Sequence, residues 1–324
     1  MLEVMNVTIP FFGLIFIGYV LLLWKIVPVE AVTGINRLVL YVALPCLVYL
    51  LCSRSSIADL FNVTLLSTYA AAGLCVVAVA TYITMKQTGR WSDSAFSALV
   101  AAFPNSGFLG VPAILAIFGK AAGASIIATV VVDLLLITSL CVGISSLSSD
   151  TSHNNVGSPV AAALRTLKGM SSNPLPWAVG AGALSSAMNA QLPEVLLKPV
   201  EMLAQSASPV SLIAIGTVLA RSRLLAAEDS SPLSSVDYLP VVAIKLLLHP
   251  LLVLTFGKAA IALGAPISLI QLKVVIAVAC LPSASNVAPV AERFGANVGR
   301  IAKIILVSTM VAFISFPSAV IFLR

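Results

Sequence analysis

Charged residues are scarce in this sequence. Of its 324 residues, only 9% are Asp, Glu, Lys or Arg, whereas 60% are hydrophobic. A soluble domain carries roughly 25% charged residues, because its surface must face water. This scarcity excludes an ordinary soluble protein and indicates that lipid surrounds most of the chain. The formal net charge of +6 does not point to nucleic acid, because the basic residues lie mostly between apolar runs.

The residue patterns that carry enzymatic or metal chemistry are missing as well. The five cysteines form no CxxC pair, and the two histidines, His153 and His249, lie far apart in the sequence. No HExxH, GxSxG or Walker pattern occurs. We therefore expect no metal ion, no cofactor and no enzymatic activity. Without a nucleotide site, the protein is not expected to be a primary pump by itself.

Long apolar runs make up most of the chain. The run over residues 63–85 is unbroken, as in a transmembrane helix, whereas barrel strands alternate apolar and polar residues over about ten positions. The sequence predicts an all-α integral membrane protein. We predict ten transmembrane helices, at residues 7–24, 34–52, 63–85, 94–118, 122–146, 174–190, 200–220, 237–257, 269–294 and 299–322.

The two halves of the chain carry matching prolines. Pro10 and Pro174 are 164 residues apart, and so are Pro45 and Pro209. Five helices in each half mean that the second half enters the membrane from the opposite side, so we predict two inverted repeats. The predicted parts are the first repeat at 1–146, a connecting loop at 147–173 and the second repeat at 174–324.

The fourth and ninth predicted helices are interrupted by proline next to small polar residues. Proline removes a backbone donor, and glycine, serine and asparagine favour an unwound backbone. We therefore predict that these two helices are broken and cross near the middle of the bilayer. The predicted helix-break residues are Pro104, Pro112, Pro282 and Pro289.

Each predicted break exposes the N-terminus of a half-helix. Such an end carries roughly half a positive charge and unpaired N–H groups, so two converging ends favour a carboxylate. The alternative is that these residues only brace the crossing. The predicted substrate-binding residues are Asn105, Ser106, Gly107, Ser283, Ser285 and Asn286.

Three further polar residues lie inside predicted helices, where a charge is costly and usually functional. Asp133 is a candidate for coupling or gating, by taking up a proton or pairing with Lys245; a structural brace is the alternative. Lys245 either snorkels to the interface or adds positive potential for an anion. His249 is a candidate proton site, or a residue that bonds a backbone carbonyl.

The distribution of basic residues predicts the orientation. Loops on one side of the predicted helices hold eleven Lys and Arg residues, and loops on the other side hold six. The richer side is expected to be cytoplasmic. We therefore predict a multi-pass protein of the cell membrane, plasma or inner, with both termini outside and the central loop cytoplasmic.

Four segments resemble the auxin efflux carrier family. They are Asn36 to Pro45, Pro104 to Pro112, Lys245 to Pro250, and Pro282 to Pro289. The resemblance implies two inverted five-helix repeats, a scaffold and a mobile domain, and a substrate site where the broken helices cross. It allows a homodimer through the scaffold helices. The short central loop favours a bacterial permease of the malonate or malate kind.

These features together predict a secondary transporter that works by alternating access. Its expected partners are the lipid bilayer and a small organic carboxylate anion such as malonate, malate or an auxin-like acid. Two other functions stay open: a sodium-coupled symporter of the bile-acid-carrier type, and a transporter-like metabolite sensor. Sodium would need several converging oxygen ligands, and Glu292 is the one acidic residue near the breaks.

Overall fold

The computed structural model describes residues 2–147, 173–190, 192–228 and 234–323. Within these residues the regular secondary structure is helical, apart from one isolated β-bridge. This confirms the prediction of an all-α chain. The predicted connecting loop at 147–173 lies, apart from its two end residues, outside the described part of the chain.

Six helical spans in the described residues are long and apolar enough to cross a membrane, which supports an integral membrane protein. They are Ala31–Ser53, Ile57–Thr88, Lys120–Ser145, Glu194–Arg221, Ser235–Ala262 and Val298–Leu323. Three shorter apolar helices are Ile9–Leu23, Ser106–Phe118 and Leu269–Ala279. A total of ten transmembrane helices stays a prediction.

The first half of the chain forms helices that are often divided by short π-helical or 3-10 turns, labelled η. They are α1 (Leu2–Leu23), α2 (Ala31–Leu38), η1 (Val39–Ala43), α3 (Leu44–Ser53), α4 (Ile57–Leu60), α5 (Val63–Thr88), α6 (Trp91–Ala102), η2 (Ser106–Gly110), α7 (Val111–Phe118), η3 (Lys120–Ala122), α8 (Gly123–Val131), η4 (Val132–Ile137) and α9 (Thr138–Ser145).

The second half continues in the same manner. Its elements are α11 (Pro174–Ala187), α12 (Glu194–Glu228), α13 (Ser235–Ala243), η5 (Ile244–Leu248), α14 (His249–Ala262), α15 (Leu269–Ala279), α16 (Val287–Arg293) and α17 (Val298–Leu323). At 35 residues, α12 is longer than the predicted helix at 200–220, because the helix continues through polar residues at both ends.

Local sequence sets several of these boundaries. The side chain of Asn62 accepts a hydrogen bond from the Leu65 N–H and caps the start of α5, and Gly89 ends that helix with a φ of 66°. Ser268 and Gln271 form a capping box at the start of α15. Such residues satisfy backbone groups that a helix end leaves free.

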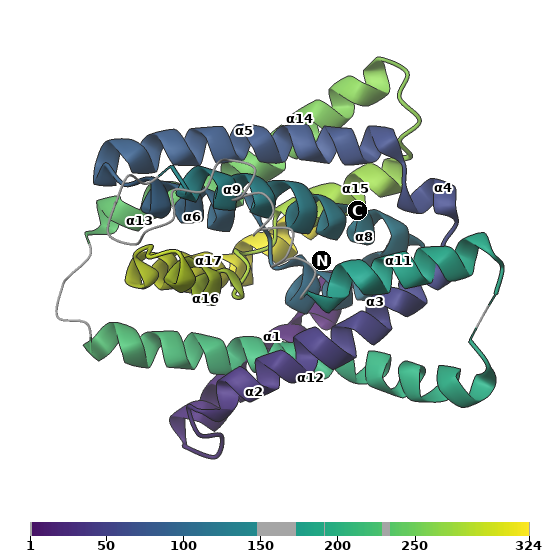
Figure 1. Cartoon of the computed structure of the whole chain (residues 1–324), viewed down its shortest axis with the longest axis horizontal. Helices are drawn as coiled ribbons and strands as arrows, with labels where there is room; N and C mark the ends of the chain where they lie inside the picture. Colours follow the sequence, from purple (N-terminus) through teal and green to yellow (C-terminus); the bar gives the residue numbers. More distant parts are fainter. Residues whose placement is uncertain (1, 148–172, 191, 229–233, 324) are drawn as a thin grey trace.

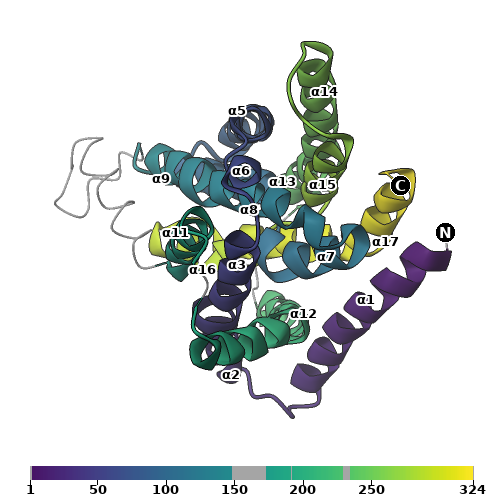
Figure 2. The ribbon, with the colours of Figure 1, turned by 90° about the vertical axis from the view of Figure 1, so that its right-hand side faces the viewer.

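The helices pack into two groups. In the scaffold group (α1, α2, α3, α11 and α12), α1 packs on α12 and α11 packs on α3. In the crossing group (α5 to α9 and α13 to α17), α5 packs on α6 and α14, and α6 packs on α9. Figure 1 shows α12 with α2 and α3 along one side of the molecule and α5 with α14 along the other. Figure 2 shows the same separation from the end, with α7 and α8 between the two sides.

Glycine allows the scaffold helices to approach each other closely. A Cβ atom on Gly18 of α1 would lie 2.1 Å from the carbonyl oxygen of Ile213 in α12. A Cβ atom on Gly182 of α11 would lie 2.7 Å from the carbonyl oxygen of Tyr49 in α3. Small residues at such contacts are typical of packed membrane helices.

Candidate functional site

Two helical interruptions meet in the interior of the crossing group. The helix that begins with α6 stops at Ala102 and resumes at Ser106, and the helix that begins with α15 stops at Ala279 and resumes at Val287. The intervening segments run antiparallel and form a β-bridge between Pro104 and Ser283. The two chain segments therefore cross in direct contact.

Backbone hydrogen bonds join the two interruptions symmetrically. The Asn105 N–H donates to the Pro282 carbonyl at 2.8 Å, and the Ala284 N–H donates to the Phe103 carbonyl at 3.1 Å. An unpaired backbone group is costly inside a membrane protein, because no lipid group can replace the bond. Each interruption therefore satisfies polar groups of the other.

A side chain satisfies the carbonyl that Pro104 leaves free. Proline has no N–H to donate to the carbonyl four residues earlier, which here belongs to Val100. The Ser283 hydroxyl donates to the Val100 carbonyl at 2.7 Å, and the Ser283 N–H donates to the Ser308 hydroxyl at 3.3 Å. Ser283 is fully buried and braces the crossing in this conformation.

Two of the four predicted helix-break prolines do not break a helix. Pro112 lies in the first turn of α7, and Pro289 is the third residue of α16. At Pro289 the helix has only just begun, so the N–H that proline lacks would have no partner within the helix. Because α7 follows η2 directly, Pro112 lies inside the continuous helix Ser106–Phe118. Pro112 still frees the Phe108 carbonyl, which receives a 2.7 Å hydrogen bond from the Ser211 hydroxyl of α12.

A small cavity lies at the crossing, between the two helix groups. Its volume is about 20 Å³, enough for about one water molecule. Scaffold residues contribute apolar side chains, and the crossing group contributes most of the polar atoms. The lining residues are Leu40, Leu44, Phe103, Pro104, Asn105, Ser106, Gly107, Phe108, Val130, Leu134, Leu175, Ala284 and Asn286.

Four of the six predicted substrate-binding residues line this cavity: Asn105, Ser106, Gly107 and Asn286. Ser283 lies behind it, and Ser285 is half-buried beside it without being part of the lining. The structure therefore brings together one amide from each interrupted helix. Whether these residues bind a substrate stays a prediction.

The polarity of the cavity comes from amides, hydroxyls and backbone, because none of the lining residues is charged. The Asn105 carbonyl accepts the N–H groups of Leu109 and Gly110 at the start of the resumed helix. The first N–H groups of a helix have no partner within it and carry its positive end. Here η2 begins at Ser106, at the cavity wall.

The three other predicted residues form a buried cluster behind the crossing. Asp133, Lys245 and His249 are each fully buried. The Lys245 ammonium lies 3.0 Å from His249 Nδ1 and donates to the Ala279 carbonyl at 3.3 Å, at the last residue of α15. Lys245 therefore does not snorkel to the interface, and the imidazole contacts Lys245 at Nδ1.

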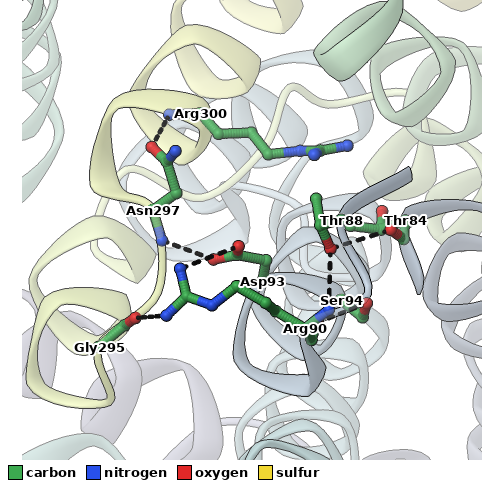
Figure 3. A network of polar contacts seen from close by, with 8 residues as sticks. All are labelled: Thr84, Thr88, Arg90, Asp93, Ser94, Gly295, Asn297 and Arg300. Carbon is green, nitrogen blue, oxygen red and sulfur yellow. Dashed lines mark hydrogen bonds and ion pairs between the residues drawn. The ribbon is translucent and has the colours of Figure 1, made fainter. Parts of the chain in front are cut away.

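A polar network at one end of the crossing group was not foreseen from the sequence (Figure 3). Asp93 is only 4% exposed and accepts the Asn297 N–H at 2.7 Å and an Arg90 N–H at 3.4 Å. Arg90 also donates to the Gly295 carbonyl at 3.1 Å. The network ties the start of α6 to the turn between α16 and α17, and so fixes both interrupted helices at this end.

Arg300 adds to the same end of the molecule. It is 2% exposed, and its guanidinium donates to the side chain of Gln87 at the end of α5. In the sequence, Arg90 and Arg300 look like the loop charges that orient a membrane protein. Arg90 reaches Gly295 and Arg300 reaches Gln87, each more than 200 residues away, so no local signal could have revealed these two contacts.

The sequence of this chain is similar to those of known membrane transport proteins. A family model described as "Membrane transport protein" matches residues 3–320. A relative from Rhizobium meliloti (strain 1021), with the name "Putative malonate transporter", is 24% identical over 316 residues. The match covers 96% of this chain and 93% of the relative. Both interrupted helices and the cavity lie within the matched region.

Proposed function

This chain belongs to the membrane transport protein family, which is the auxin efflux carrier family, and from that premise we propose that it is a permease for a small organic carboxylate such as malonate. The name of the relative supports malonate as the first substrate to test. Transport is proposed to occur by alternating access and without a nucleotide.

The cavity at the crossing is the observation that carries the proposal. Asn105 and Asn286 reach it from the two interrupted helices, and η2 begins beside it at Ser106. Amide N–H groups and the positive end of a helix are suited to a carboxylate. The apolar remainder, with Leu44 and Leu175 from the scaffold group, would face the carbon skeleton of the substrate.

The absence of a charged side chain from the lining suits a transporter. A fixed cation in a dry cavity would hold an anion strongly, whereas helix ends and amides carry partial charges. A transported ion must bind well enough to enter and weakly enough to leave. The partial charges at η2 meet both conditions.

The present conformation is proposed to be closed around the site. A cavity of about 20 Å³ holds about one water molecule and is too small for a dicarboxylate. Because scaffold and crossing residues form opposite walls, relative movement of the two groups would enlarge the site. We infer that the crossing group moves and that the scaffold group stays in place.

Spacing in the scaffold supports the proposed inverted repeats at 1–146 and 174–324 and, with them, ten transmembrane helices. Gly18 and Gly182 are 164 residues apart, and so are their contact residues Tyr49 and Ile213. Each glycine lies against a backbone carbonyl of the other proposed repeat. A pseudo-twofold axis in the membrane plane would produce such reciprocal contacts.

The orientation is proposed from the loop charges. Eleven basic residues on one side against six on the other favour both termini outside and the central loop in the cytoplasm. The cell membrane is the proposed location.

Alanine at Asn105 or Asn286 tests the site. Loss of a hydrogen bond to a charged group costs about 1.5–3 kcal/mol, so we expect malonate affinity and uptake to fall by about tenfold or more. Purified protein is reconstituted into liposomes for uptake, and ligand-induced thermal stabilisation is measured in parallel.

Asn189→Gly is the matched control. Asn189 is exposed, lies away from the cavity, and has a φ of 48° that glycine tolerates. This variant should transport as the wild type does. Wild-type uptake by both Asn105→Ala and Asn286→Ala would exclude the proposed site.

A further inference from the structure

Four titratable side chains from three helical spans meet behind the crossing. Asp133 comes from η4, Tyr69 from α5, Lys245 from η5 and His249 from the start of α14. All four are at most 2% exposed. π-helical turns occur often at functional sites. Asp133 and Lys245 each lie in such a turn, η4 and η5 respectively.

Lys245 is well satisfied as a cation. Its ammonium lies against His249 Nδ1 and donates to the Ala279 carbonyl. That carbonyl belongs to the last residue of α15, where the partial negative charge of the helix end favours a cation. The structure therefore gives this charge fixed partners.

Asp133 is poorly satisfied as a carboxylate. One oxygen, Oδ2, lies 3.4 Å from the Tyr69 hydroxyl, and the other, Oδ1, has no hydrogen-bond partner among the described residues. His249 Nε2, in the same cluster, likewise has no partner in this part of the chain. A buried carboxylate usually accepts several hydrogen bonds, because burial removes its hydration. Uptake of a proton would remove the negative charge that the surroundings fail to stabilise.

Asp133 lies beside the cavity, because its neighbour Leu134 in η4 is part of the lining. It is also close enough to Ser106 and Lys245 to interact electrostatically with both. Ser106 begins η2 and lines the cavity. A carboxylate at this place opposes the positive helix end that would attract a substrate anion, and it cancels the charge of Lys245.

We propose that Asp133 is a proton-binding site that controls the affinity of the cavity for its anion. Binding transfers one proton from water to a carboxylate oxygen, forms an O–H bond, and changes the cluster of Asp133 and Lys245 from neutral to a net charge of +1. Proton and anion then bind cooperatively, and each strengthens the binding of the other to the same degree. The transporter carries them together.

The neighbouring groups fit this assignment. Tyr69 faces Asp133 from α5, and Lys245 faces it from η5. His249, at the start of α14, lies against Lys245 and the Tyr69 ring. Cys280, just beyond α15, interacts with Lys245. The acid of α6, Asp93, lies in the network at the far end of that helix and is paired with Arg90 (Figure 3).

This proposal rests on the proposed function, and wild-type protein tests it directly. Malonate is titrated into the purified protein in weakly buffered solution between about pH 7 and pH 8, where carboxylic acids are ionised in water. We expect proton uptake on binding and an affinity that falls by up to about tenfold per pH unit, the limit for one linked proton.

Asp133→Asn keeps the shape of a protonated carboxyl group and removes its titration. We expect tight malonate binding in this variant, with no proton uptake and no pH dependence. In liposomes, an imposed pH gradient should drive uptake by the wild type and not by Asp133→Asn, while malonate exchange should persist in both. Asp59→Asn, at an exposed residue of α4, is the control and should behave as the wild type.

The possible outcomes separate the two proposals. Failure of malonate and of other small carboxylates to bind at any pH would contradict the proposed function. Binding by the wild type without proton uptake and without pH dependence would contradict the role of Asp133 and leave the function intact. Uptake driven by a sodium gradient and not by a pH gradient would also contradict the role of Asp133. The wild-type measurements remain a valid test even when the variant does not fold.

Discussion

Carbonyl groups that lose their helical donor receive another donor from a distant part of the chain. This holds at both interruptions and at the first turn of α7, and each donor is a side chain rather than lipid or a neighbouring turn. Because a free carbonyl is costly away from water, the donors are part of what allows the helices to break. The pairs are Val100 with Ser283, Phe108 with Ser211, and Ala279 with Lys245.

Gly107 offers a test of the cavity at the level of one methyl group. A Cβ atom on Gly107 would lie 3.6 Å from a Leu44 methyl group, an ordinary van der Waals contact, so alanine fits in the closed conformation. The added methyl group would occupy space between the scaffold and η2. We expect Gly107→Ala to raise the KM for malonate severalfold, equivalent to about 1 kcal/mol, without lowering the unfolding temperature.

Gly34→Ala, in α2, is the control for this substitution. No atom lies within 4 Å of a Cβ placed at Gly34, so its KM should equal that of the wild type. An unchanged KM in Gly107→Ala as well would argue that the substrate binds elsewhere. A fall in the unfolding temperature would instead show that the position tolerates no side chain.

At the residue scale, the sequence predicted some of the polar residues that line the cavity, but not which distant side chains bond the freed carbonyls. Pro104 and Asn105 were recognisable, because proline next to small polar residues inside an apolar run is a local pattern. The role of Ser211 was not, because one serine in an apolar helix resembles any other. Its importance depends on the freed carbonyl of Phe108 on another helix, which only the fold reveals.

At the scale of elements, the apolar runs located the helices well and their internal irregularities poorly. Hydrophobicity reports burial in lipid and is the same for an α-helix and for a π-helical turn. The turns η1 and η5 each lie just before a proline, Pro45 and Pro250. The missing N–H of proline explains why the helix widens there; the turn η4 has no proline and could not be predicted.

Close contact of scaffold helices predicts a strong effect of a single methyl group. Alanine at Gly18 would place its Cβ 2.1 Å from a backbone oxygen, so α1 and α12 would have to separate. Overpacking of this kind costs about 1–3 kcal/mol, and we expect a lower unfolding temperature for Gly18→Ala in detergent. Gly182→Ala should act similarly, through Tyr49 in α3.

Each of these substitutions has a control on its own helix. Positions Gly13 in α1 and Gly180 in α11 have no atom within 4 Å of an added Cβ. Alanine there should leave stability unchanged or raise it, because alanine favours a helix by up to about 1 kcal/mol over glycine. Equal unfolding temperatures for Gly18→Ala and Gly13→Ala would refute the close approach.

At the scale of the whole molecule, the two helix groups have to separate at their shared surface for the substrate to enter. The hydrogen bond from Ser211 to the Phe108 carbonyl crosses that surface, from α12 in the scaffold group to η2 in the crossing group. The Ser211 hydroxyl also lies 2.9 Å from the Ser208 carbonyl on its own helix. On separation Ser211 keeps a partner, whereas the Phe108 carbonyl loses one, so this bond stabilises the closed conformation.

Ser211→Ala should therefore favour the open conformation. An unsatisfied buried carbonyl costs about 1–3 kcal/mol, and this cost falls on the closed state alone. Malonate enters only the open conformation, and its apparent affinity is reduced in proportion to how rarely that conformation is populated. A larger open population should therefore make malonate bind at least about fivefold more tightly and exchange faster in liposomes. Ser206→Ala, whose hydroxyl bonds the Leu203 carbonyl within α12, should match the wild type. Wild-type affinity and exchange in Ser211→Ala would mean that the two groups do not separate at this contact, and weaker binding would mean that Ser211 serves the loaded state instead.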